Sequence, residues 1–170
     1  MDFPEISYGS RQQLQDARAT IRILFTKNKE VLSDVAALAR DLKKTYEALD
    51  QYFTAYTEPF CRLCLNPCCV NRHGFPDFED LVIFEAMGRR DTVFDYRAKE
   101  TDVCQYLGKD GCMLPRCHRS YRCTWYLCDK VCERFAFDHS LAFRQFELLM
   151  ENLVDGRKKI LALFSSLCKH

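Results

Sequence analysis

The chain has 170 residues, a formal net charge of +1 at pH 7 and 48% hydrophobic residues. This length suits one domain that buries its own core, and the balanced charge lacks the basic excess that favours nucleic-acid binding. The acidic N-terminus contains no apolar segment typical of a secretory signal, and no apolar run is long enough to span a membrane. We therefore expect a single cytoplasmic domain over residues 1–170, with no membrane or nucleic-acid partner.

The first part of the chain predicts two helices. Ser10 and Gln13 form a capping-box pattern, and apolar residues follow at helical spacing to about residue 28. A second helix begins near Lys29 and ends before Pro59. Its apolar positions alternate in steps of four and three: Val31, Val35, Leu38, Leu42, Tyr46, Leu49, Phe53 and Tyr56. The simplest interpretation is a helical hairpin over residues 10–56. The alternative is a dimerisation face.

The middle of the chain predicts only short elements. Residues 70–75 are expected to form a loop, and Asp77 begins a short helix that Gly88 ends. Weak alternation over residues 92–96 indicates a short strand. The turn at residues 108–111 predicts a small hairpin around Cys104 and Cys112.

The end of the chain predicts a third long helix over residues 138–168, capped by Asp138 or Ser140, with Gly156 as a point of bending. The expected fold is therefore mainly α. Long helices pack around a cysteine-rich metal-binding insert, residues 60–134, which has little or no β structure.

Eleven cysteines stand out in this composition. Without an export signal, such a number indicates metal chemistry more than a disulfide framework or free thiols. The densest group is Cys61, Cys64, Cys68 and Cys69, and its Cys-x-x-Cys spacing can direct two thiolates at one metal. Adjacent cysteines cannot easily reach the same single ion, so this group favours a polynuclear cluster or two neighbouring sites. A second block contains Cys104, Cys112, Cys117, Cys123, Cys128 and Cys132.

The order and spacing of these residues over positions 60–129 resemble the YkgJ-type cysteine-cluster family of zinc- or iron-chelating domains. The resemblance rests on Arg119 and eight cysteines: Cys61, Cys64, Cys68, Cys69, Cys104, Cys112, Cys123 and Cys128. It implies that these eight are the metal ligands. The cysteine content also resembles, more distantly, that of flagellin lysine methylases. The chain departs from the family pattern at Ser120, where proline is usual, and at Thr124, where arginine is usual.

Thiolates bind zinc, iron and iron–sulfur clusters. We favour a [4Fe–4S] cluster over Zn²⁺ because three closely spaced cysteines and one remote cysteine suit such a cluster, and the second block lacks a Cys-x-x-Cys knuckle. The basic stretch Arg116, His118, Arg119 and Arg122 is interpreted as compensation for thiolate charge, and Arg119 is the cofactor-binding candidate.

Three functions follow in order of preference. They are an accessory module for electron or metal handling, an enzyme that uses the cluster, and a structural zinc module whose long helices meet a protein partner. Cys117, Cys132 and Cys168 fall outside the matched set, and we expect Cys132 to be a better additional ligand than Cys168. Trp125 and Tyr126 are expected to shield the site from water.

Overall fold

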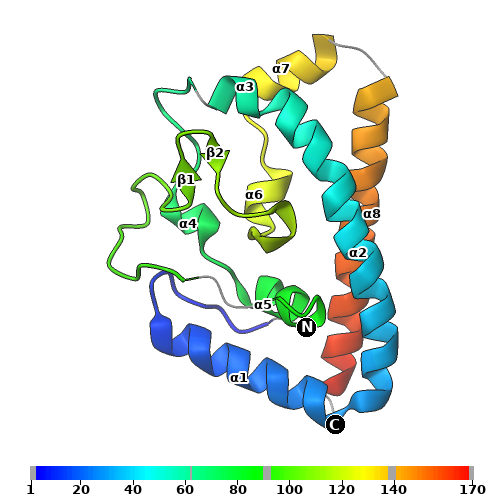
Figure 1. Cartoon of the computed structure of the whole chain (residues 1–170). Helices are drawn as coiled ribbons and strands as arrows, with labels where there is room; N and C mark the ends of the chain where they lie inside the picture. Colours follow the sequence, from blue (N-terminus) through cyan, green and yellow to red (C-terminus); the bar gives the residue numbers. More distant parts are fainter. Residues whose placement is uncertain (1–2, 62, 90–92, 138–140, 169–170) are drawn as a thin grey trace.

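The computed structural model describes residues 3–61, 63–89, 93–137 and 141–168 (Figure 1). The described part is mainly helical with one small antiparallel strand pair, which confirms the expected fold class. Its elements are α1 (Arg11–Lys27), α2 (Lys29–Tyr56), α3 (Glu58–Cys61), α4 (Asn71–Gly74), α5 (Phe78–Ala86), β1 (Leu107–Gly108), β2 (Gly111–Cys112), the 3₁₀ helix η1 (Arg116–His118), α6 (Arg122–Trp125), α7 (Asp129–Phe137) and α8 (Leu141–Leu167). None of the helices in these ranges is both long and apolar enough to cross a membrane.

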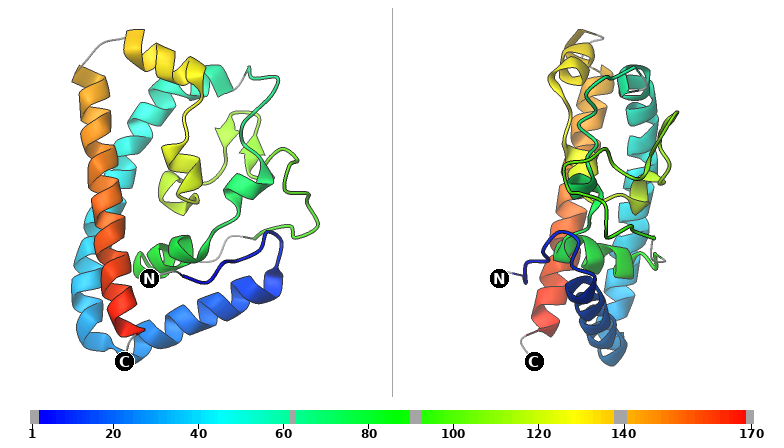
Figure 2. Two further views of the ribbon diagram at one scale, coloured as in Figure 1. Left: turned by 180° about the vertical axis from the view of Figure 1, so that it is seen from behind. Right: turned by 90° about the vertical axis from the view of Figure 1, so that its left-hand side faces the viewer.

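Helices α2 and α8 lie side by side along most of their length (Figures 1 and 2). The seam on α2 is buried as its spacing predicts, with Leu42, Leu49 and Phe53 each no more than 3% exposed. The helices approach closely at Gly156, where an added Cβ would lie 3.0 Å from Cδ1 of Leu42. Gly156 therefore gives α8 room to pack against α2, and the helix continues through this position without a break.

Helix α1 does not form the expected hairpin with α2. Ser10 caps it as predicted, with its Oγ accepting from the backbone N–H of Gln13 at 3.3 Å. From Asn28, however, the two helices diverge, and α1 packs mainly against α5 (Figures 1 and 2). The long apolar seam of α2 is thus covered by α8. The helical hairpin expected over residues 10–56 is wrong, because the main partner of α2 is α8 and not α1. The packing of a helix face requires an apolar neighbour but does not specify which one.

The insert between α2 and α8 consists of short elements. The expected hairpin is confirmed, although it is small, with Leu107 paired to Cys112 and Gly108 to Gly111. Helix α5 is confirmed too, with Asp77 as its N-cap. Residues 71–74, expected to be a loop, form the short helix α4, and residues 93–96 show no strand. Helix α7 was not predicted as a separate element. Asp138, Ser140 and His139 lie outside the described residues, and so does Thr92.

A buried ion pair connects the insert to the long helices. Asp80 of α5 and Arg157 of α8 are 2% and 4% exposed, and Arg157 NH1 lies 3.2 Å from Asp80 Oδ1. The same carboxylate oxygen accepts from the backbone N–H of Tyr121 at 2.9 Å, and the Arg157 guanidinium lies over the Tyr121 ring. Burial raises the pKa of Asp80 to about 6. At pH 7 this carboxylate is therefore ionised opposite Arg157, and it fixes the segment that leads into α6.

Candidate metal centre

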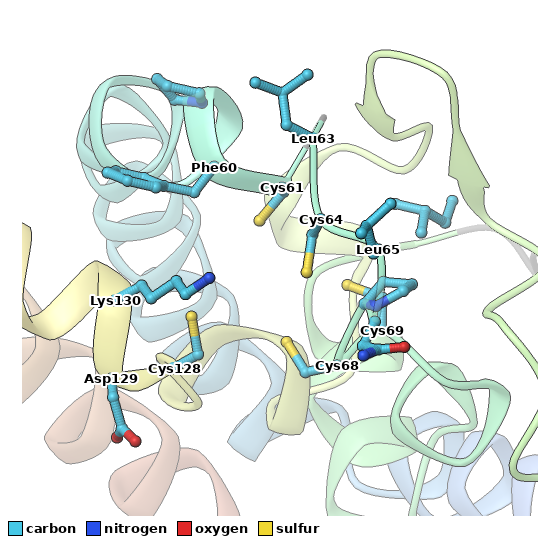
Figure 3. Close-up of a pocket in the computed structure, with 14 residues that line it drawn as sticks. Phe60, Cys61, Leu63, Cys64, Leu65, Cys68, Cys69, Cys128, Asp129 and Lys130 are labelled. Atoms are coloured by element: carbon cyan, nitrogen blue, oxygen red, sulfur yellow. The ribbon is translucent and has the colours of Figure 1, made fainter.

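The first cysteine block and one cysteine from the second block line a single pocket of about 740 Å³ (Figure 3). Cys61 reaches it from the last residue of α3, Cys64 and Cys68 from the loop that follows, and Cys128 from the residue before α7. Figure 3 shows the sulfur atoms of Cys61 and Cys64 directed toward those of Cys68 and Cys128. We call these four residues the outer group. The rest of the wall includes Phe60, Leu63, Leu65 and Lys130.

Local backbone structure places each member of the outer group. Cys61 ends α3, where its N–H donates to the carbonyl oxygen of Thr57 at 2.9 Å, and the N–H of Cys64 donates to the carbonyl of Cys61 at 3.3 Å. Cys128 precedes α7, and its carbonyl accepts from the N–H groups of Val131 and Cys132. Helix α7 is held against α2 by the rings of Phe135 and Tyr56, whose centroids are 4.0 Å apart. This contact brings Cys128 to the pocket.

A second set of cysteines lies deeper in the insert, and we call Cys69, Cys104, Cys112 and Cys123 the inner group. The N–H of Cys104 donates to the carbonyl of Cys69 at 2.9 Å, next to an isolated antiparallel bridge between Val70 and Val103. Cys112 belongs to β2. The Cys123 thiol donates to the carbonyl oxygen of His73 at 3.2 Å. The inner group therefore gathers residues from three separate segments.

Cys61 and Cys123 each have a pKa that is raised by thiols of their own group. Burial raises the pKa of Cys61, and the outer-group thiols add to that rise. Burial also raises the pKa of Cys123 to about 11, and Cys104 and Cys112 act in the same direction. Thiols that influence one another in this way are close enough to lose protons together when a cation binds.

Cys69 lies at the junction of the two groups. A hydrogen bond from its thiol lowers the pKa of Cys68 to about 6 and raises its own pKa. Cys69 also lines the outer pocket, and the Cys123 thiol of the inner group lies within its electrostatic range. Cys69 therefore has partners in both groups, with Cys68 and Cys61 on the outer side and Cys123 on the inner side.

The donor set fits a soft metal, although the thiols have not closed around one point. All eleven cysteines are free thiols. Within the described ranges, no three His, Cys, Asp or Glu side chains stand close enough together to hold an ion. The thiols of the outer group converge on one pocket, and thiolate sulfur is the ligand type that zinc and iron prefer. Side-chain rotation in the loop would be required for these thiols to meet at one metal.

The basic stretch is divided by the fold. Arg119, the predicted cofactor-binding residue, donates from Nε to the carbonyl oxygen of Leu114 at 2.8 Å, and its charge favours the thiolate of Cys123. Arg116 is buried against α2. His118 lies near Lys43 and Arg89, and its pKa is lowered by burial and by these two cations. His118 is therefore placed among positive charges, which is a poor environment for a metal ligand.

The remaining candidates lie away from the pocket wall. Cys132 and Cys168 are exposed, and the half-buried Cys117 lies within the electrostatic influence of Lys43. Trp125 and Tyr126 are 51% and 42% exposed and line a separate pocket that shares Cys68 with the outer group.

The sequence predicts that the two blocks converge, with Cys61 and Cys64 near at least one of Cys104, Cys112, Cys123 and Cys128, and Cys128 lines the same pocket as the first block. Spacing did not single out Cys128 among these four, because that contact depends on the docking of α7.

Comparison of the chain with protein-family models, with curated protein sequences and with solved structures gives no significant match. The functional argument for this chain therefore rests on its own residues and their arrangement.

Proposed function

We propose that this protein holds a thiolate-bound metal centre, either an iron–sulfur cluster or zinc, and acts as an accessory module for electron or metal handling. The observation that carries the proposal is the convergence of Cys128 with Cys61, Cys64 and Cys68 on one pocket (Figure 3). Four cysteines from two distant segments provide the number and type of ligands that either cofactor requires.

We assign the eight matched cysteines to two sets of four. The outer group supplies one complete set. The inner group supplies a second, which Cys69 joins because its backbone is paired with Cys104 and its thiol lies within the electrostatic range of Cys123. This division explains the adjacent pair Cys68–Cys69, since each residue then serves its own metal.

We favour the iron–sulfur cluster at the outer group. Three closely spaced cysteines, at the end of α3 and in the loop that follows, and a fourth from elsewhere suit a cubane cluster. Such a cluster would supply one-electron transfer. Within this site, the chain's own cysteines would bind the metal, and the exposed side chains of Phe60, Leu63 and Leu65 form an apolar rim around it.

Structural zinc is the second candidate. The described helices of the insert have no more than nine residues and its strands have two, so these elements are too short to be stable alone. Metal ligation is a common source of stability for such loop-rich segments. In this case the long helices would present the surface for a protein partner.

Anaerobic purification followed by metal analysis and a visible absorption spectrum tests the proposal. Iron with acid-labile sulfide and a visible band that bleaches on reduction would indicate a cluster, whereas zinc without visible absorption would indicate the structural site. Protein that binds neither metal after anaerobic reconstitution would refute the proposal.

Two cysteines of the same segment provide a matched comparison. Cys128→Ser replaces a soft thiolate in the outer group by a hydroxyl that stays protonated, so metal content per chain should fall. Cys132→Ser makes the same change four residues later, at an exposed position outside the pocket wall, and metal content should remain at the wild-type value. Equal metal content in the two variants would contradict the assignment of Cys128.

A further inference from the structure

Arg116 is the buried member of the basic stretch. Its side chain is 6% exposed, whereas Arg122 is exposed and Arg119 is partly exposed. A buried guanidinium loses most of its hydration, so its position is expected to be fixed by specific partners. The sequence alone does not distinguish Arg116 from its basic neighbours.

Three contacts hold this guanidinium. Its Nε donates to Oδ1 of Asp50 at 3.2 Å, and NH1 donates to the carbonyl oxygen of Cys123 at 3.4 Å. Its central carbon lies 3.6 Å from the centroid of the Phe53 ring. Two of the three partners come from α2, so the long helix fixes a positive charge against the cysteine insert.

The positive charge of Arg116 acts on cysteines of both groups. Arg116 touches the backbone of Cys123 and lies within electrostatic range of the Cys112 thiol, both in the inner group. It also acts on the Cys61 thiol of the outer group. Asp50 is 48% exposed, so water screens its negative charge better than protein screens the buried cation.

We propose that Arg116 is a positioning residue that offsets the negative charge of the thiolate centre from the side of α2, and that Asp50 and Phe53 keep it in place. The inference rests on the proposed function, because four thiolates around Zn²⁺ or a cluster leave a net negative charge that a fixed buried cation stabilises. Arg116 thereby links metal affinity to the docking of the insert on α2.

Zn²⁺ titration of the metal-free, reduced chain in competition with a chromophoric chelator tests the proposal. Arg116→Met removes the charge and keeps an apolar side chain against Phe53, and we expect zinc affinity to fall about 10- to 100-fold. Arg116→Lys should restore most of that loss. The control Arg122→Met removes an exposed cation of the same stretch and should change affinity by less than about threefold.

Wild-type protein that takes up neither zinc nor, on anaerobic reconstitution, iron would refute the proposed function itself. If the chain takes up iron alone, the iron content of the same variants replaces zinc affinity as the measurement. Suppose instead that the wild-type chain binds zinc. Unchanged affinity in Arg116→Met, or a loss in Arg116→Lys as large as that in Arg116→Met, would then refute only the proposed role of the Arg116 charge. Asp50→Asn provides an independent check if Arg116→Met does not fold. Its amide oxygen can still accept from Arg116 Nε while one negative charge is removed, so zinc affinity should stay equal or increase. A weaker affinity in Asp50→Asn would overturn the proposal.

Discussion

Replacing Asp80 by Ala should destabilise the protein by leaving a charge buried in its core. Arg157 is 4% exposed and faces the Asp80 carboxylate at 3.2 Å. Removing one partner of a buried ion pair typically costs about 3–5 kcal/mol, because the other charge stays desolvated without compensation. Asp80→Ala also removes the acceptor for the Tyr121 N–H, and an unsatisfied buried donor costs about 1–3 kcal/mol.

Glu79 limits the expected loss. Its carboxylate lies 3.9 Å from Arg157 NH2 and is 47% exposed, so it can move toward the guanidinium once Asp80 is absent. We therefore expect a loss in the free energy of unfolding of about 3 kcal/mol, at the lower end of the range. This is a large part of the about 5–15 kcal/mol that stabilises an ordinary domain.

Urea unfolding of metal-loaded protein, monitored by circular dichroism, measures this loss. The double variant Asp80→Ala/Arg157→Met removes both charges and should be more stable than Asp80→Ala alone. The control Glu100→Ala breaks the exposed pair with Arg72, which is shorter at 2.7 Å, and should cost no more than about 1 kcal/mol. A loss below about 1 kcal/mol in Asp80→Ala, or no recovery in the double variant, would refute the reasoning.

Three further outcomes are expected. Cys123→Ser should lower metal content per chain while the exposed Cys168→Ser leaves it unchanged, and metal analysis showing the reverse would contradict the ligand assignment. Chelation under reducing conditions should expose residues 60–134 to protease, and an unchanged digestion pattern would contradict a metal-dependent insert. Gly156→Ala places a methyl group 3.0 Å from Leu42 Cδ1. Overpacking of about 1–3 kcal/mol should outweigh a helix-propensity gain of about 1 kcal/mol, so the melting temperature should fall rather than rise.

The long helices could be predicted from sequence because their signals are local. The apolar spacing of α2 and the Ser10 cap of α1 depend only on residues one or two turns apart. The partner of α2 could not be predicted in this way, because an apolar face shows that it is buried but not against which helix. A clue was present at Gly156, whose missing side chain permits the close approach to Leu42.

The short elements of the insert carried weaker signals. Helix α4 has only four residues, which are too few to show the hydrophobic periodicity of a helix. Helix α7 could have been found, since Val131 and Phe135 are one turn apart and both are buried. The eight matched cysteines were selected by the resemblance of their order and spacing to a known cysteine-cluster pattern, and their division into groups required the three-dimensional positions of α7 and β2. The roles of these cysteines as ligands remain a prediction that metal analysis will test.

The backbone pairing of Cys69 with Cys104 has a consequence for the stability of the insert. Together with the Val70–Val103 bridge, it closes the excursion of residues 70–103, whose helix α5 docks on α1 and α8. Closing a loop of this length costs conformational entropy, which the packing of α5 helps to offset. A metal held by Cys69 and Cys104 would act at the base of this loop, so its removal should loosen the whole excursion and not one side chain alone.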